Sequence, residues 1–262
     1  MDLDTIQSVV EELLEENLST LEYYFSVYEE LAEDRDALHD EIIHKILSRK
    51  TYSKNKRVYM LGGATANGKS TFLNSGIRQY PLDALKIDPD EVKAELPEYK
   101  YMVALKEMTA ASRVHEESSI ISKEIRRIAI EEDYDILLDG IANDTLEHRL
   151  EDLAELKSHG HTVIIDYVTL DTSLSLQNAL DRYRKTGRFV PEEFILEKNR
   201  MIAELVPQLI ENKSFDELYL WDTNIKNKPR LILSQINGIL ALENQELYDN
   251  FKNKAHETGS ES

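Results

Sequence analysis

The sequence predicts an α/β protein with a doubly wound, mainly parallel five-stranded sheet and a helical N-terminal extension. Three observations support this fold class. Short apolar segments alternate with longer amphipathic stretches, which is typical of parallel strands joined by helical crossovers. The first apolar segment ends at Gly62-Gly63, where a tight turn is expected. Before it, apolar residues such as Leu38 and Ile42 recur at helical spacing.

The elements are predicted in order from this pattern. Strands are expected at Val58–Leu61, Ala84–Ile87, Ile136–Leu138, Val163–Tyr167 and Leu218–Trp221. Helices are expected after Lys69, from Pro89, and at Ala111–Glu132, Thr145–Ser158, Leu174–Lys185, Pro191–Glu211 and Leu231–Phe251. The chain is therefore divided into a helical extension at residues 1–50, an α/β domain at 51–254 and an unstructured tail at 255–262.

Composition restricts the partners and the location of the protein. Among its 262 residues, 50 Asp and Glu against 31 Lys and Arg give a net charge of -19, so a nucleic-acid partner is not expected. The chain has no cysteine, which excludes disulfides and a thiolate nucleophile. The N-terminus is acidic and periodic rather than basic and then apolar, and no apolar run approaches the ~18 residues of a membrane span. We therefore expect a soluble, cytoplasmic protein with no membrane partner.

The motif that carries most information begins where the first expected strand ends. Gly63-Ala-Thr-Ala-Asn-Gly68-Lys69-Ser70 matches GxxxxGK[ST] between a strand and a helix. Backbone amides of such a loop surround phosphate oxygens, the Lys reaches the β- and γ-phosphates, and the Ser binds Mg²⁺. A plain strand-to-helix turn would not require Lys followed by Ser. The expected ATP-binding residues are Gly63, Ala64, Thr65, Ala66, Asn67, Gly68, Lys69, Ser70 and Thr71.

An acid is expected beside this loop to hold Mg²⁺ together with Ser70. Asp139 ends the apolar run Ile136–Leu138, and an acid at the end of the neighbouring strand commonly binds the metal in P-loop proteins. The alternative is a turn or capping residue, since acids often follow strands.

The segment after the second expected strand offers a catalytic base. Asp88, Pro89 and Glu91 have the spacing of a helix cap, so Asp88 has a purely structural explanation as well as a role near substrate. Asp90 would lie on the first turn of the following helix. There it could accept the proton of an attacking hydroxyl.

Two further segments contain candidate residues. Arg182 and Arg188 belong to a basic stretch with Gly187, which indicates either a lid that closes over the γ-phosphate or a solvated helix face. Glu116 and Glu117 are candidate substrate contacts, with an exposed helix as the alternative.

Taken together, these segments resemble the zeta toxin family of P-loop kinases. The resemblance rests on ALHDEII, GGATANGKST, KIDPDEVKAELPEY, VHEESS, ILLDG and TGRFVP, in this order between about Ala37 and Asn224. It implies a P-loop kinase domain, ATP and Mg²⁺ as cofactors, and transfer of phosphate to a hydroxyl of UDP-N-acetylglucosamine. It also implies a toxin-antitoxin system, in which a small antitoxin blocks the nucleotide site.

The resemblance also assigns roles by position. It places Lys69 and Ser70 on the phosphate loop, Asp90 on the general base, and Arg182 and Arg188 on phosphate contacts. Asp139 replaces a Glu at the matching strand end. Lys123 lies at the position where members of the family have a substrate-contacting Glu, so the identity of the sugar acceptor is left open. Asp88, Glu116, Glu117 and Lys123 are accordingly the candidate acceptor contacts.

Alternatives remain for the N-terminal helices and for the activity. The helices before Leu31 either pack against the core or, being rich in Glu, cover the nucleotide site as a built-in inhibitor. The activity is either the sugar-nucleotide kinase reaction, phosphorylation of another small-molecule or polynucleotide hydroxyl, or an ATP-dependent switch that transfers nothing.

Overall fold

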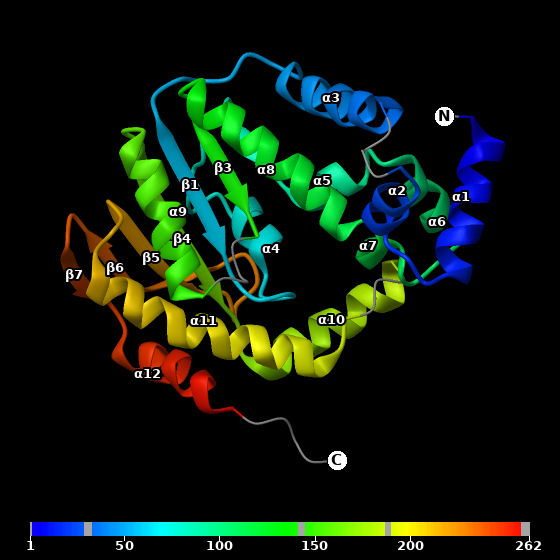
Figure 1. The fold of residues 1–262 in the computed structure, drawn as a ribbon. Helices are drawn as coiled ribbons and strands as arrows, with labels where there is room; N and C mark the ends of the chain where they lie inside the picture. Colours follow the sequence, from blue (N-terminus) through cyan, green and yellow to red (C-terminus); the bar gives the residue numbers. More distant parts are fainter. Residues whose placement is uncertain (1, 29–32, 141–144, 187–189, 258–262) are drawn as a thin grey trace. The chain divides into compact units, whose positions relative to one another are not determined.

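The computed structural model describes residues 2–28, 33–140, 145–186 and 190–257 (Figure 1). The chain forms two compact units, each built from separate segments. The first unit contains residues 1–52 and 87–132, and the second contains residues 53–86 and 133–262. The expected boundary near residue 50 matches the end of the first segment. However, residues 87–132, which were expected inside the α/β domain, belong to the unit that contains the N-terminal helices.

The second unit is built on the predicted sheet, which confirms the fold class. The described strands are β1 (Arg57–Gly62), β2 (Leu85–Ile87), β3 (Ile136–Asp139), β4 (Thr162–Thr169), β5 (Glu217–Asp222), β6 (Arg230–Ile236) and β7 (Ile239–Leu242). Their order is β2-β3-β1-β4-β5-β6-β7, so the sheet has seven strands where five were expected. Strand β1 pairs in parallel with β3 and β4, and β4 pairs in parallel with β5. Strands β6 and β7 are antiparallel additions at one edge.

The helices of this unit are α4 (Lys69–Asn74), α9 (Leu146–Ser158), α10 (Thr172–Thr186), α11 (Glu192–Asn212) and α12 (Gln245–Asn253). Helix α9 packs on β4, α10 packs on α11, and α12 packs on β6. One face of the sheet meets α4, because Phe72 packs against Leu61, Val168 and Trp221. No helix in the described part of the chain is both long and apolar enough to cross a membrane.

The C-terminal part of the sheet corrects one prediction. Residues 231–251 were expected to form a single helix, but they contain β6, β7 and α12. The turn between the two strands is Asn237-Gly238, and both residues have positive φ, at 49° and 77°. Asn-Gly favours this backbone because neither residue opposes the left-handed region strongly. The tail also differs, because Lys254–His256 form a 3-10 helix where no structure was expected beyond residue 254.

The described residues of the first unit form mainly helices and their connections. Its described helices are α1 (Leu3–Glu15), α2 (Thr20–Tyr28), α3 (Glu33–Leu47), α5 (Pro89–Lys93), α6 (Pro97–Ala104), α7 (Ala110–Arg113) and α8 (His115–Glu131). Helix α8 is the centre of this unit, because α2, α3, α5 and α7 all pack against it. Helix α1 packs on α6. The N-terminal helices are therefore part of the core of this unit.

Candidate active site

The glycine-rich loop begins at the end of β1, where its backbone packs closely against β4. A Cβ atom at Gly62 would lie 2.3 Å from the Tyr167 ring, and one at Gly63 would lie 2.6 Å from Val168 Cγ2. Close contact with β4 therefore requires glycine at both positions, and Gly63 also has a positive φ of 150° that a side chain would oppose. Lys69, the first residue of α4, donates from Nζ to the carbonyl oxygen of Gly63 at 2.8 Å. Its side chain thus folds back along the loop that it follows.

The second half of the loop alternates in backbone handedness. Ala66 has φ of 66° and Gly68 has φ of 81°, whereas Asn67 between them has an ordinary negative φ. Alternating hands make successive amide groups converge into a concave surface that favours anions. With the Lys69 ammonium beside it, this arrangement fits the polyphosphate of a nucleotide.

The predicted metal residue lies at the end of the strand next to the loop. Asp139 is the last residue of β3 and pairs in register with Leu61 of β1, and the amide of Gly140 donates to the Leu61 carbonyl at 3.1 Å. Ser70 is exposed on the first turn of α4. One hydroxyl and one carboxylate fit Mg²⁺, which takes few protein ligands and completes its shell with phosphate and water.

The Asp139 carboxylate also has a cationic neighbour. It lies 3.7 Å from the Nζ atom of Lys86, a residue of β2. Among the described residues, no cluster of three or more His, Asp or Glu side chains could hold a metal without a nucleotide. Binding of Mg²⁺ at Asp139 would therefore have to compete with the Lys86 ammonium.

Helix α10 contacts the loop and carries Arg182, one of the two predicted phosphate contacts. Ser175 and Asn178 of α10 both hydrogen-bond residues of the loop, and Arg182 lies one further turn along the same helix face. The Arg182 side chain is exposed. Arg188, the second predicted phosphate contact, lies outside the described residues.

The predicted acid segment belongs to the first unit. Asp88 caps α5, because its side chain accepts a hydrogen bond from the amide of Asp90 at 3.0 Å and Pro89 occupies the first turn. This confirms the capping interpretation. The Glu91 side chain accepts a hydrogen bond from Arg49 at 3.0 Å.

Asp90, the predicted base, is half-exposed on the first turn of α5. Its side chain is 46% exposed and accepts from Lys93 Nζ at 3.1 Å. His115 at the start of α8 is close enough to be affected by both charges: burial and Lys93 lower the pKa of His115, and Asp90 opposes the change. Asp90 therefore combines access to solvent with a fixed cationic neighbour.

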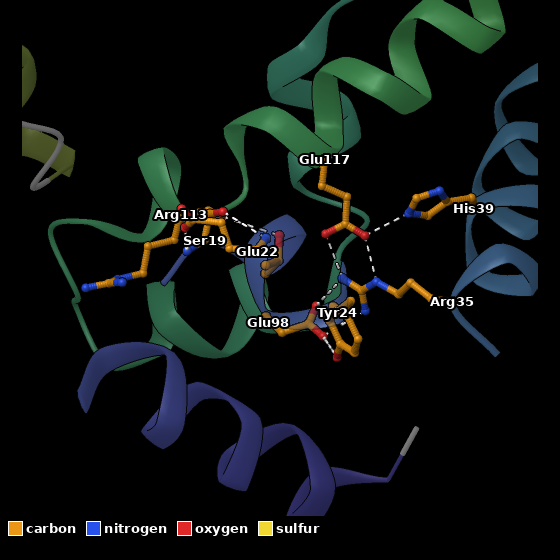
Figure 2. Close-up of polar contacts among 9 residues, drawn as sticks. Ser19, Glu22, Tyr24, Arg35, His39, Glu98, Arg113 and Glu117 are labelled. Atoms are coloured by element: carbon orange, nitrogen blue, oxygen red, sulfur yellow. Dashed lines mark hydrogen bonds and ion pairs between the residues drawn. The ribbon is translucent and has the colours of Figure 1, made fainter. Parts of the chain in front are cut away.

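The candidate acceptor contacts on α8 divide into two groups. Glu116 and Lys123 are exposed, as a role in contacting a small molecule requires. Glu117 is only 1% exposed, and its oxygens accept from Arg35 at 2.6 and 2.7 Å and contact His39 Nε2 at 2.7 Å (Figure 2). The expectation that Glu117 lies on an exposed helix face or contacts substrate is therefore replaced by a buried ion pair.

This ion pair extends into a buried network that no local sequence pattern predicts. Arg35 also donates to Glu98 at 2.8 and 3.1 Å, and the Tyr24 hydroxyl donates to Glu98 at 2.5 Å (Figure 2). Burial and the Glu98 charge raise the pKa of Tyr24. The partners lie 63 to 82 residues apart in sequence, so no local pattern connects them. The one local signal is an acid, Glu98, in the first turn of a helix.

A glycine-rich phosphate loop between a central parallel strand and a helix, with an acid ending the adjacent strand, defines a P-loop protein of the kinase type. The model of the zeta toxin family matches residues 43–231, which is more than half of the chain. The chain belongs to the zeta toxin family.

Solved structures with the same fold share little sequence with this chain. The complex of AvrRxo1-ORF1 and AvrRxo1-ORF2 with sulphate ions is 16% identical, covers 88% of this chain and 76% of that chain, and has a TM-score of 0.65. The same complex with ATP has the same identity and coverage, with a TM-score of 0.63. A structure of the PezAT chromosomal toxin-antitoxin system of Streptococcus pneumoniae is 17% identical over 75% of this chain and 78% of that chain, with a TM-score of 0.59. A search of curated protein sequences finds no match.

Proposed function

We propose that this protein transfers the γ-phosphate of ATP to a hydroxyl of a sugar nucleotide, with UDP-N-acetylglucosamine as the first candidate acceptor. The observation that carries the proposal is the loop: Lys69 follows a turn in which Ala66 and Gly68 have positive φ, and an adjacent strand ends in Asp139. Membership of the zeta toxin family supports phosphoryl transfer in particular. One structure of the same fold was solved with ATP, which supports ATP as the donor.

Each candidate residue would have a separate role in the reaction. The loop amides and Lys69 would bind the β- and γ-phosphates, while Ser70 and Asp139 would hold Mg²⁺, which neutralises phosphate charge when bound. Asp90 would accept the proton of the acceptor hydroxyl while the oxygen of that hydroxyl bonds to the γ-phosphorus. The bond from that phosphorus to the β–γ bridging oxygen then breaks and ADP leaves.

The remaining residues would orient the two substrates. Arg182, with Arg188, would neutralise charge on the phosphoryl group in transfer, because guanidinium groups match phosphate oxygens in pairs. Asp88, Glu116 and Lys123 would contact the acceptor. Asp88 also caps α5, so it would in addition fix the helix that carries Asp90.

Mass spectrometry of a UDP-sugar panel incubated with ATP, Mg²⁺ and the protein tests this proposal. We expect a mass increase of one phosphoryl group on UDP-N-acetylglucosamine, lost in Asp90→Asn while ATP binding by calorimetry is kept. Glu91→Gln on the same helix turn serves as the matched control and should retain transfer.

Three other outcomes would each revise the proposal differently. Transfer to another compound would keep the kinase and change its acceptor, and transfer to a polynucleotide end would contradict the argument from net charge. ATP hydrolysis without transfer to any acceptor, unchanged in Asp90→Asn, would replace the kinase with an ATP-dependent switch.

We also propose that an antitoxin protein partners this chain. The AvrRxo1-ORF1 structures contain a second protein, AvrRxo1-ORF2, and PezAT is described as a toxin-antitoxin system. Induced expression in a bacterial host tests the toxic activity: growth should stop with the native chain and continue with Lys69→Ala at equal protein level. Arrest by Lys69→Ala as well would separate toxicity from nucleotide chemistry.

A further inference from the structure

A chain of buried polar side chains joins the phosphate loop to two helices of the second unit. The Ser175 hydroxyl of α10 donates to Asn67 Oδ1 at 2.6 Å, and Asn67 Nδ2 donates to Asn199 Oδ1 of α11 at 2.9 Å. Ser175, Asn67 and Asn199 are 0%, 2% and 3% exposed. The Asn67 side chain is therefore bound within the protein, and its backbone amide also donates to the carbonyl oxygen of Ala64 at 3.2 Å.

Hydrogen bonds also hold the loop backbone at Ala66 and Asn67. Asn178 of α10 donates from Nδ2 to the carbonyl oxygen of Ala66 at 3.2 Å, and the Thr223 hydroxyl donates to the carbonyl oxygen of Asn67 at 2.9 Å. Ala66 is a non-glycine residue with φ of 66°, a conformation that costs of order 1 kcal/mol and needs support from its surroundings. These contacts from neighbouring elements supply that support.

Helix α10 connects this network to the proposed phosphate chemistry. Ser175 and Asn178 are three residues apart and Arg182 follows four residues later, so all three share one face of the helix. The first two side chains on this face contact the loop. A rotation or shift of α10 would therefore move Arg182 and disturb the Asn67 contacts together.

We propose that Asn67 is a positioning residue that couples the geometry of the phosphate loop to the helix that carries Arg182. The inference rests on the proposed function, because it assigns Arg182 to the γ-phosphate. Buried hydrogen bonds in a dry site are costly to leave unmade, so the loop and α10 move as one body. Arg182 then meets the phosphates in a fixed position, which is the condition for effective charge stabilisation.

A purely structural network would be built differently. In the part of the chain that the structure describes, the Asn199 Nδ2 atom is buried and has no hydrogen-bond partner. An unsatisfied buried donor lowers stability, and an apolar residue of similar shape would avoid that cost. The network therefore keeps a polar link to Asn67 where packing alone would favour an apolar contact.

The ratio of ATP affinity to ADP affinity isolates contacts to the γ-phosphate and needs no acceptor. Calorimetry with Mg²⁺ would measure this ratio for the native chain, Ser175→Ala, Arg182→Ala and the double variant. We expect Arg182→Ala to lower the ratio about tenfold in the native chain, as loss of one charge-assisted hydrogen bond does. In the Ser175→Ala background, Arg182→Ala should lower this affinity ratio less than about threefold, because Arg182 is no longer held in a fixed position.

The matched control is Ser173→Ala, an exposed serine on the first turn of the same helix. Combined with Arg182→Ala it should leave the tenfold effect intact. Asn67→Ala provides the second variant and should reproduce the behaviour of Ser175→Ala, with a native-like unfolding transition as evidence of folding.

Equal effects of Arg182→Ala in the native, Ser175→Ala and Asn67→Ala backgrounds would overturn the inference and leave the proposed function standing. No effect of Arg182→Ala in the native chain would also overturn it, since Arg182 would then not contact the γ-phosphate. Failure of the native chain to bind ATP at all would instead contradict the proposed function itself.

Discussion

Arg35 and Glu117 form a two-point ion pair in which Nε and one terminal nitrogen of the guanidinium bind the two carboxylate oxygens at 2.6 and 2.7 Å. Both side chains are almost completely buried. The remaining donors of Arg35 bind Glu98, so one cation serves two buried carboxylates (Figure 2). Because a buried charge is tolerated only when it is paired, each member of this set depends on the others.

Replacement of Arg35 should destabilise the protein severely. Arg35→Met would leave Glu98 and Glu117 buried without their cation, and we expect a loss of about 3–5 kcal/mol in the free energy of unfolding. Urea denaturation measures this loss. The matched control is Arg127→Met, which removes exposed pairs with Glu124 and Glu131 and should cost less than about 1 kcal/mol. Equal costs for the two variants would contradict the role of the buried network.

Acid should remove part of this stability in a defined range of pH. Burial alone would raise the pKa of Glu117, but hydrogen bonds from His39 and Arg35 and the Arg35 charge outweigh it and lower the pKa from 4.5 to about 2. The unfolded state therefore binds more protons between these values. The stabilisation, about 3 kcal/mol, is complete above pH 4.5 and is lost as the pH falls toward 2.

The control for this pH dependence is Glu117→Gln. This variant cannot titrate at residue 117, so its free energy of unfolding should fall less steeply than that of the native chain between pH 4.5 and pH 2. Denaturant unfolding at several pH values measures both slopes. Parallel curves would show that other carboxylates cause the acid sensitivity.

Deletion of residues 1–30 should weaken the first unit. The guanidinium of Arg113 would lose the carbonyl oxygens of Leu13 and Leu18, which it binds at 2.8 and 2.7 Å, and Glu98 would lose the Tyr24 hydroxyl. Tyr24→Phe alone should cost about 1.5–3 kcal/mol, since its hydroxyl binds a charged acceptor. Thermal unfolding of both proteins measures these changes.

The same deletion distinguishes the two explanations of the N-terminal helices. If they only pack within the first unit, the folded fraction of the deleted protein should hydrolyse ATP at the native rate. A higher rate per folded molecule would support the built-in inhibitor instead. The Tyr24→Phe variant is the control, because it weakens the same contacts without removing the helices.

Gly62→Ala should damage the phosphate loop by steric contact alone. The new Cβ atom would lie 2.3 Å from the ring of Tyr167, which is fully buried and cannot turn aside. We expect a loss of about 1–3 kcal/mol in stability and weaker ATP binding. Gly62→Ala combined with Tyr167→Leu should recover part of both, because the smaller side chain makes room. No recovery would mean that the contact with Tyr167 is not the cause.

The ion pair between Lys86 and Asp139 should affect the metal dependence. Asp139→Asn should raise the Mg²⁺ concentration for half-maximal ATP binding about tenfold, whereas Lys86→Met should lower it by removing a competing cation. Titration of Mg²⁺ against ATP affinity measures both shifts. Asp133→Asn, at a half-exposed acid before the opposite end of β3, should change nothing. Shifts of the same sign in Asp139→Asn and Lys86→Met would contradict this model.

Local pattern was sufficient for five of the seven described strands and for the Asp88 cap. All five expected strands are present, because each is a short apolar run bounded by polar or glycine residues. Asp88 was identified as a cap because capping depends only on residues within one turn. The helix expected at Leu231–Phe251 is wrong because Asn237-Gly238, a strong hairpin signal, interrupts it.

The site was predictable only where its residues are neighbours in sequence. The structure places Gly63 and Lys69 at the loop and Asp139 at the adjacent strand end, as their local sequence predicts, and their roles stay predictions. The role of Glu117 could not, because its partner Arg35 lies 82 residues away and nothing local distinguishes it from the exposed Glu116. The partners of Asn67 lie 108 and 132 residues away in sequence, so the burial of its side chain could not be predicted from local sequence either.

The interleaving of the two units constrains how the chain can fold during synthesis. The chain leaves the first unit after Tyr52, returns at Ile87 and leaves again after Glu132. During synthesis, about eighty residues must be added after Arg35 before its partner Glu117 is available. Until then the N-terminal helices lack the partners that bury them, and chaperones have a defined interval in which to bind this segment of the nascent chain.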